Sequence, residues 1–115
     1  MVVLAAEGDT VWAKIAVTAP NESYFENVTS DTSGNIYAVG YIKGTGTFNF
    51  GNSVTVSGVS GLKKVVIVKY NSSGVAQWAK STVTATNFSW SYDTAVDSLG
   101  NIYISGFVYG NGSVG

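Results

Sequence analysis

The chain has 115 residues, of which 45% are hydrophobic and only 11% are charged, and it contains neither cysteine nor histidine. A chain of this length builds one modest domain. The missing residue types exclude disulfides, thiolate nucleophiles, Ser-His-Asp triads and zinc sites of the usual kind. We therefore expect no metal and no cofactor.

Charge and hydropathy exclude two further classes of protein. The net charge is −1 and the six basic residues are scattered lysines, whereas nucleic-acid-binding proteins carry a basic stripe. Lys63-Lys64 is the only basic pair, and we interpret it as the solvated start of a strand. No apolar run approaches the ~18 residues of a membrane span. The first six residues lack the basic region and the apolar length of a signal peptide.

Short strands rich in β-forming residues recur along the chain. In chain order they are expected near 24–30, 35–42, 65–70, 75–81 and 101–108. No segment holds a helical apolar period over a helical length. The long connection 43–64 contains two short β-like runs around Gly51-Asn52, which favours a small hairpin of its own. The sequence thus predicts an all-β protein.

Tight turns separate several of these strands. The pattern Asx-x-x-Gly ends the strands, and its members are Asp31 and Gly34, Asn71 and Gly74, and Asp97 and Gly100. The Asp or Asn side chain accepts hydrogen bonds from the backbone ahead of it, and the glycine supplies a positive φ. These six residues are interpreted as structural, and a calcium role for Asp31 and Asp97 is disfavoured because dense oxygen ligands are missing.

An internal repeat of 66 residues organises the chain. Shifted by that length, the sequence matches itself without a gap at 18 of 49 overlapping positions, by direct count. Trp12 aligns with Trp78, Asp31 with Asp97, and 34–37 with 100–103. Alternate residues of the strand at 35–42 are apolar on both faces, so the sheet needs a layer above and below it. Stacked four-stranded blades supply such layers, and Trp12 and Trp78 are predicted to pack between blades.

The repeat resembles a known family. Asp-x-x-Gly-Asn-Ile-Tyr-x-x-Gly at 31–40, Lys-Tyr-Asn-x-x-Gly at 69–74 and Gln-Trp-Ala-Lys at 77–80 are similar to the bacterial β-propeller repeat of the SBBP type. The resemblance covers nearly the whole chain. It implies propeller blades of four antiparallel strands and a secreted or cell-surface parent protein in bacteria, and it implies no particular activity.

The repeat also predicts how the chain is divided into blades. The repeat predicts that residues 1–115 form one two-blade segment, in which 1–23 hold the third and outer strands of a shared blade, with the third strand at 1–4. It predicts a complete blade over 24–81 and the first two strands of another shared blade over 82–115. The open strand edges favour pairing between copies, and closed propellers have roughly 4–8 blades. We therefore expect a cyclic homo-oligomer, a trimer or a tetramer.

Two functions remain open on the sequence alone. One is a non-enzymatic structural or adhesive module. The other is a glycan-binding module, whose site would lie among the long connections, near Tyr24, Phe88 and Trp90. A glycosidase pair among Glu22, Glu26 and Asp93 is disfavoured because no acid pair is repeated.

Overall fold

The computed structural model describes the backbone of residues 3–7, 9–14, 16–82 and 88–109, and side chains within 16–82 and 91–107. The described residues form strands, turns and bends with no helix, so the all-β prediction is confirmed. In chain order the strands are β1 (Val3–Glu7), β2 (Asp9–Lys14), β3 (Ser23–Ser30), β4 (Ile36–Lys43), β5 (Gly46–Asn49), β6 (Thr55–Gly58), β7 (Lys63–Tyr70), β8 (Ala76–Ser81), β9 (Phe88–Val96) and β10 (Ile102–Tyr109).

The centre of the molecule is a four-stranded antiparallel sheet, here called the main sheet, with the order β3-β4-β7-β8. Each strand lies within two residues of its predicted range. Val68 pairs with Ala38 on one side and with Ala79 on the other. A bulge between Phe25 and Asn27 interrupts the pairing of β3 with β4.

Two smaller sheets come from the two ends of the chain. Strands β9 and β10 pair with each other, and β10 spans the residues that the 66-residue shift assigns to it from β4. Strands β1 and β2 also pair, but β1 runs over Val3–Glu7, so the predicted strand at 1–4 is wrong in its bounds. The physical reason is the residue at the expected turn: Ala5 stands where the repeat has Asn71, and alanine has no oxygen to cap a turn.

The connection between β4 and β7 covers one face of the main sheet. It forms the predicted hairpin of β5 and β6, and this hairpin inserts Phe48 and Phe50 into a core shared with Phe25, Val68 and Tyr70. The ring centroids of Phe25 and Phe50 are 5.9 Å apart. The sequence analysis expected only neighbouring blades to cover the sheet, whereas here the chain's own excursion supplies a layer.

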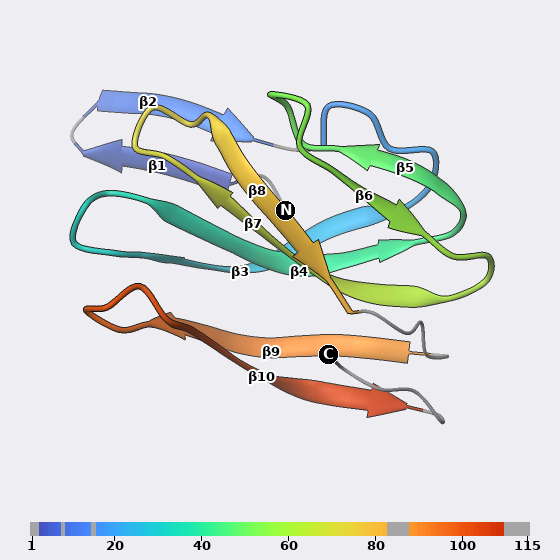
Figure 1. Ribbon diagram of the computed structural model, residues 1–115. Helices are drawn as coiled ribbons and strands as arrows, with labels where there is room; N and C mark the ends of the chain where they lie inside the picture. Colours follow the sequence, from blue (N-terminus) through green and yellow to red (C-terminus); the bar gives the residue numbers. More distant parts are fainter. Residues whose placement is uncertain (1–2, 8, 15, 83–87, 110–115) are drawn as a thin grey trace.

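Strand β9 lies across the opposite face of the main sheet, and Figure 1 shows β9 and β10 as a separate layer beside it. That face carries Tyr37, Val39 and Tyr41, which are all buried. The Ser91 hydroxyl donates a 3.2 Å hydrogen bond to the carboxylate of Glu26 on β3. Contacts therefore join residues 65 positions apart in sequence, close to one repeat length.

The two ends of the main sheet differ in their connections. The tight turns 31–34 and 71–74 are neighbours at one end, since a Cβ on Gly34 would lie 3.3 Å from the Ser72 Cβ. At the other end the segment leading into β3 pairs with the hairpin, because the Asn49 amide donates to the Thr18 carbonyl at 2.9 Å. The long connections before β3 and between β4 and β7 thus share one end (Figure 1).

The pair Lys63-Lys64 begins β7, as the sequence predicted, but the predicted solvation is wrong for Lys64. Lys64 is 8% exposed, and its ammonium donates a 3.1 Å hydrogen bond to the Ser57 carbonyl of β6. Its side chain is covered by the hairpin, which the local sequence does not reveal. Lys63 places its ammonium 4.1 Å from the ring centroid of Tyr41 on the other face.

Candidate functional site

The Asx-x-x-Gly turns are built around a carboxylate or amide oxygen. Asp31 accepts 2.9 Å hydrogen bonds from the amides of Ser33 and Asn35. Its second oxygen accepts from the Asn35 side chain at 2.8 Å and from the Tyr37 hydroxyl at 3.0 Å. Led by the Asn35 side chain, these hydrogen bonds hold the pKa of Asp31 below its ordinary value. Because all four contacts are internal to the turn and strand, the carboxylate has a structural role.

The other two turns repeat this design. Asp97 accepts from the Leu99 and Asn101 amides, each at 2.9 Å, and from the Tyr103 hydroxyl at 3.2 Å. Asn71 caps its turn in the same way, accepting from two backbone amides at 3.0 and 2.9 Å. The glycines that end the turns have the predicted positive φ, namely Gly34 at 80°, Gly74 at 78° and Gly100 at 82°.

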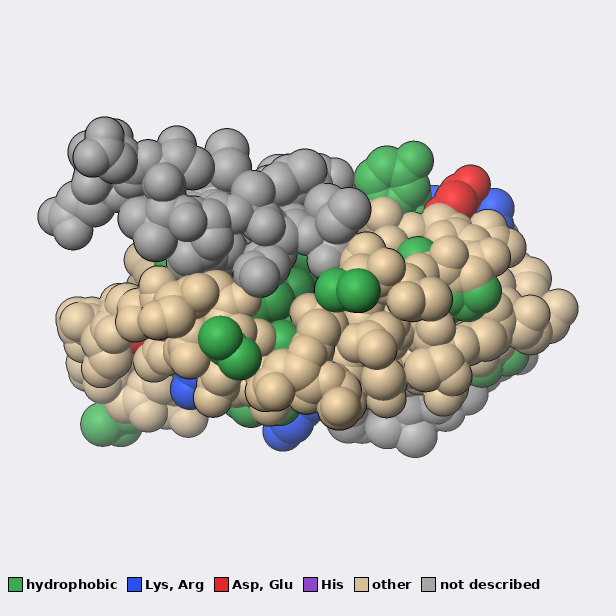
Figure 2. Space-filling view, turned by 90° about the horizontal axis from the view of Figure 1, so that it is seen from above, with side chains coloured by type: hydrophobic (Ala, Val, Ile, Leu, Met, Phe, Trp, Pro, Cys, Tyr) green, Lys and Arg blue, Asp and Glu red, His purple; other side chains and the backbone are tan. Residues whose placement is uncertain are grey.

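Few side chains in the described part of the chain are candidates for a metal-binding or charged site. Among these residues no cluster of three or more His, Cys, Asp or Glu side chains is placed to hold a metal ion. Figure 2, seen from above the view of Figure 1, shows few charged side chains, and an acidic group lies beside basic ones at one edge of this face. Across the described residues, no helix has the length and apolarity to cross a membrane.

Tyr24 lies where the sequence placed a ligand site, at the long-connection end of the main sheet. It is 48% exposed and its ring stacks on Tyr41 with centroids 5.2 Å apart. Burial, followed by the charges of Glu22 and nearby groups, raises the pKa of Tyr41. With Lys63 over the Tyr41 ring, the site presents an aromatic surface flanked by both charge signs.

The sequence analysis missed Tyr41 and Lys63 as members of this site. Tyr41 is the direct cross-strand partner of Tyr24, a register that the strand lengths alone do not fix. Phe88 and Trp90 belong to β9 and pair with Tyr109 and Phe107 of β10. The side chains of Phe88 and Trp90 lie outside the described residues, so only Tyr24 of the three predicted ligand residues can be placed in full.

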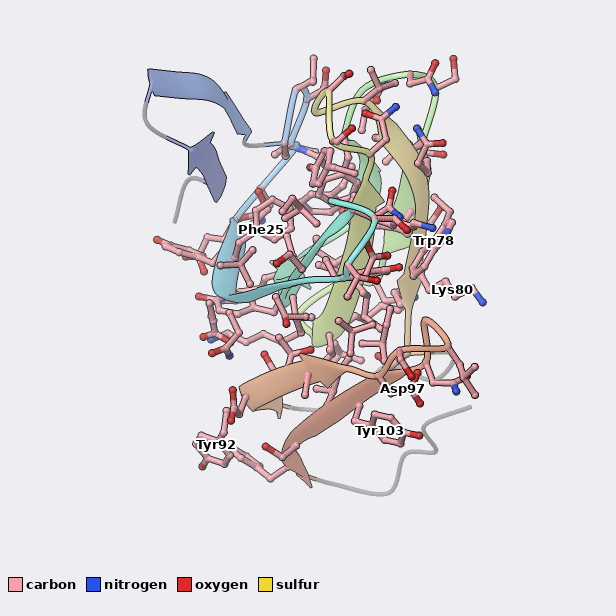
Figure 3. All side chains as sticks on the ribbon, turned by 90° about the vertical axis from the view of Figure 1, so that its left-hand side faces the viewer. Phe25, Trp78, Lys80, Tyr92, Asp97 and Tyr103 are labelled. Atoms are coloured by element: carbon pink, nitrogen blue, oxygen red, sulfur yellow. The ribbon has the colours of Figure 1, made fainter. Side chains whose placement is uncertain are left out.

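The predicted packing tryptophans are described unequally. Trp78 lies on β8, with its ring centroid 6.2 Å from that of Tyr37 and the Lys80 ammonium 5.5 Å away (Figure 3). These neighbours belong to the same sheet, so the described contacts of Trp78 lie within the main sheet. Trp12 is part of β2 and pairs with Ala5, and its side chain lies outside the described residues.

A second aromatic surface, here called the β9–β10 face, lies on the side of that sheet away from the main sheet. It consists of Tyr92, Tyr103 and Phe107, with the Tyr92 and Phe107 rings 5.8 Å apart. Figure 3 shows Tyr92 and Tyr103 pointing away from the main sheet. An open depression of about 460 Å³ is lined by residues of both strands, including Tyr103. The sequence analysis did not single out this face.

Comparison with protein-family models, curated proteins and solved structures finds no match to this chain.

Proposed function

We propose that the chain is a non-enzymatic structural module, a two-blade segment of a β-propeller whose copies join head to tail in a closed ring. The main sheet, with four antiparallel strands in sequential order, serves as the complete blade. The resemblance of its repeat to the bacterial family adds the expectation of a secreted or surface location. The observation that carries the proposal is the pair of two-stranded sheets at the chain ends.

These two sheets are complementary halves of one blade. By the 66-residue repeat, β9 and β10 correspond to β3 and β4, β2 corresponds to β8, and Val3 and Leu4 of β1 correspond to the last two residues of β7. Each half ends in a strand whose outer edge pairs with no other described strand. Pairing of β10 with β1 of a second copy would complete a four-stranded sheet and satisfy the backbone groups of both edges.

The number of blades in a closed propeller limits the number of chains in the ring. Head-to-tail contacts between identical chains either close or continue as a filament. With two blades per chain, only even blade numbers are available, and known propellers have roughly 4–8. We favour a trimer with six blades over a tetramer with eight.

The proposal is tested by the mass in dilute solution. We expect light scattering coupled to size exclusion to give three, or else four, times the chain mass of 12.0 kDa. Dilution should dissociate and unfold the protein together, since the stability of an obligate oligomer depends on concentration. A folded monomer at 12.0 kDa would refute the assembly, and a polydisperse filament would refute closure.

A second candidate function is glycan binding at the Tyr24 site. The observation that favours it is the exposed Tyr24 ring stacked on Tyr41 beside Lys63, since sugars bind to aromatic faces flanked by polar groups. We expect any glycan retained on an array to lose at least about tenfold in affinity in Tyr24→Ala, roughly 1.4 kcal/mol. Leu99→Ala, which removes an exposed apolar side chain from the turn 97–100, is the control. An array with no retained glycan would eliminate this candidate.

A further inference from the structure

The β9–β10 face is unusually exposed for an aromatic surface. Tyr103 is 61% exposed, Phe107 is 41% exposed and Tyr92 is 65% exposed. Large contiguous apolar surfaces on soluble proteins mark sites of interaction. The hydroxyl of Tyr103 donates a 3.2 Å hydrogen bond to the Asp97 carboxylate, which favours one orientation of this exposed ring.

The internal repeat indicates what kind of layer belongs on this face. Tyr103 and Phe107 are the repeat counterparts of Tyr37 and Tyr41 on β4. Those two side chains are 2% and 8% exposed, on the face that β9 crosses. Within the chain, the layer over the first repeat is therefore the beginning of the next blade. By the same arrangement, the β9–β10 face of the second repeat would be covered by the β3 side of the main sheet of another copy.

A second copy presents a matching patch on β3. Val28 pairs with Ala38, a core residue, yet Val28 itself is 46% exposed. Its counterpart on β9 is Thr94, whose hydroxyl oxygen is fully buried on the strand that crosses the main sheet. Position 28 is thus exposed in the first repeat, whereas its counterpart in the second repeat is only partly exposed.

We infer that the β9–β10 face of one copy docks on the β3 side of the main sheet of a second copy, around Val28. This inference rests on the proposed head-to-tail assembly and names the surfaces that make it.

The residues at the two junctions favour a second copy as the occupant. Within the chain, the layers meet through the polar contact between Glu26 and Ser91. The repeat counterpart of Glu26 is Tyr92, which is exposed, so the β9–β10 face carries an aromatic ring where the internal junction carries a carboxylate. The β9–β10 face has thus exchanged a polar for an apolar residue, as an interface between copies favours.

The test uses two variants, each with a lysine on one of the two surfaces. Tyr92→Lys places a charge on the β9–β10 face and leaves the Val28 patch intact, whereas Val28→Lys does the reverse. Each variant alone is expected to be monomeric at protein concentrations where the unmodified chain is assembled. An equimolar mixture should form a dimer of twice 12.0 kDa, because one intact pair of surfaces remains between the two variants. Val75→Lys is the control, since Val75 is 42% exposed next to the turn 71–74 and on neither surface.

The outcomes separate this inference from the proposed assembly. If the unmodified chain is a monomer, both fail. If it forms a ring that both lysine variants also form, the ring stands and the docking surfaces are wrong. If each variant is monomeric but the mixture forms no dimer, the loss of assembly comes from misfolding or a different contact, and the inference is refuted.

Discussion

An alanine at Gly40 is expected to cause the largest loss of stability of any substitution considered for this chain. Gly40 lies in the middle of β4, opposite Phe25 at the bulge of β3. A Cβ at this position would lie 1.7 Å from the Tyr24 carbonyl oxygen and 2.7 Å from the Phe25 Cα. Both are backbone atoms of the paired strand, so no side-chain rotation relieves the overlap and the two strands have to separate.

The expected cost of Gly40→Ala is at least about 4 kcal/mol, a large part of the roughly 5–15 kcal/mol that stabilises a typical domain. Urea denaturation followed by circular dichroism measures it at fixed protein concentration. Gly61→Ala is the matched control: its φ is 70° but nothing lies within 4 Å of the added Cβ. Backbone strain alone predicts about 1 kcal/mol there. Equal losses in the two variants would contradict the close approach of β3 and β4.

Removal of the Asp31 carboxylate is expected to have the next largest effect. Asp31→Ala leaves two backbone amides, the Asn35 side chain and the Tyr37 hydroxyl without their acceptor. Tyr37 is only 2% exposed, so water cannot readily replace the carboxylate at its hydroxyl. Hydrogen bonds to charged groups contribute about 1.5–3 kcal/mol each when buried, and partial exposure of this turn reduces the expected total loss to about 2–3 kcal/mol.

The matched control is Asp97→Ala, which removes the same group from the second repeat. Tyr103 is 61% exposed, so solvent can satisfy the groups that Asp97 leaves behind and the loss of stability should be smaller. A loss at Asp97 as large as that at Asp31 would show that burial of the tyrosine does not determine the effect. This comparison is made at a protein concentration where both variants have the same oligomeric state.

The same carboxylate predicts a dependence of stability on pH. Hydrogen bonds, chiefly from the Asn35 side chain, lower the pKa of Asp31 in the folded state from its ordinary value of 3.8. The stabilisation is therefore complete above pH values near 3.8 and is lost as the pH falls through the lower folded pKa. Unfolding free energies of the unmodified chain and of Asp31→Ala should converge in acid, and a constant difference down to pH 2 would contradict this linkage.

Local features of the fold were readable from the sequence. The turns at Asp31, Asn71 and Asp97 were predictable because their hydrogen bonds join residues at most six positions apart. The strands between 24 and 81 were predictable because β-forming residues lie between such turns. The 66-residue repeat then predicted β10 from β4. The same transfer gave the wrong bounds for β1, because Ala5 removes the oxygen on which the turn depends.

The candidate surfaces required the tertiary structure. Tyr41 and Lys63 join Tyr24 through strand register, and the burial of Lys64 depends on a hairpin that folds back over the sheet. Tyr37 and Tyr103 are tyrosines at equivalent positions of the repeat, so the sequence does not distinguish them. Only their different exposure in the structure reveals the β9–β10 face.

The sequence by itself therefore determined the class of the fold, the turns and the repeat, all of which depend on short-range propensities and on spacing along the chain. Only the tertiary structure decided which face each layer covers and which copy of a repeated residue is left open. The physical reason is that burial depends on what packs against a side chain. In this protein the packing partners come from segments such as β3 and β9, whose contact between Glu26 and Ser91 spans 65 positions of the chain.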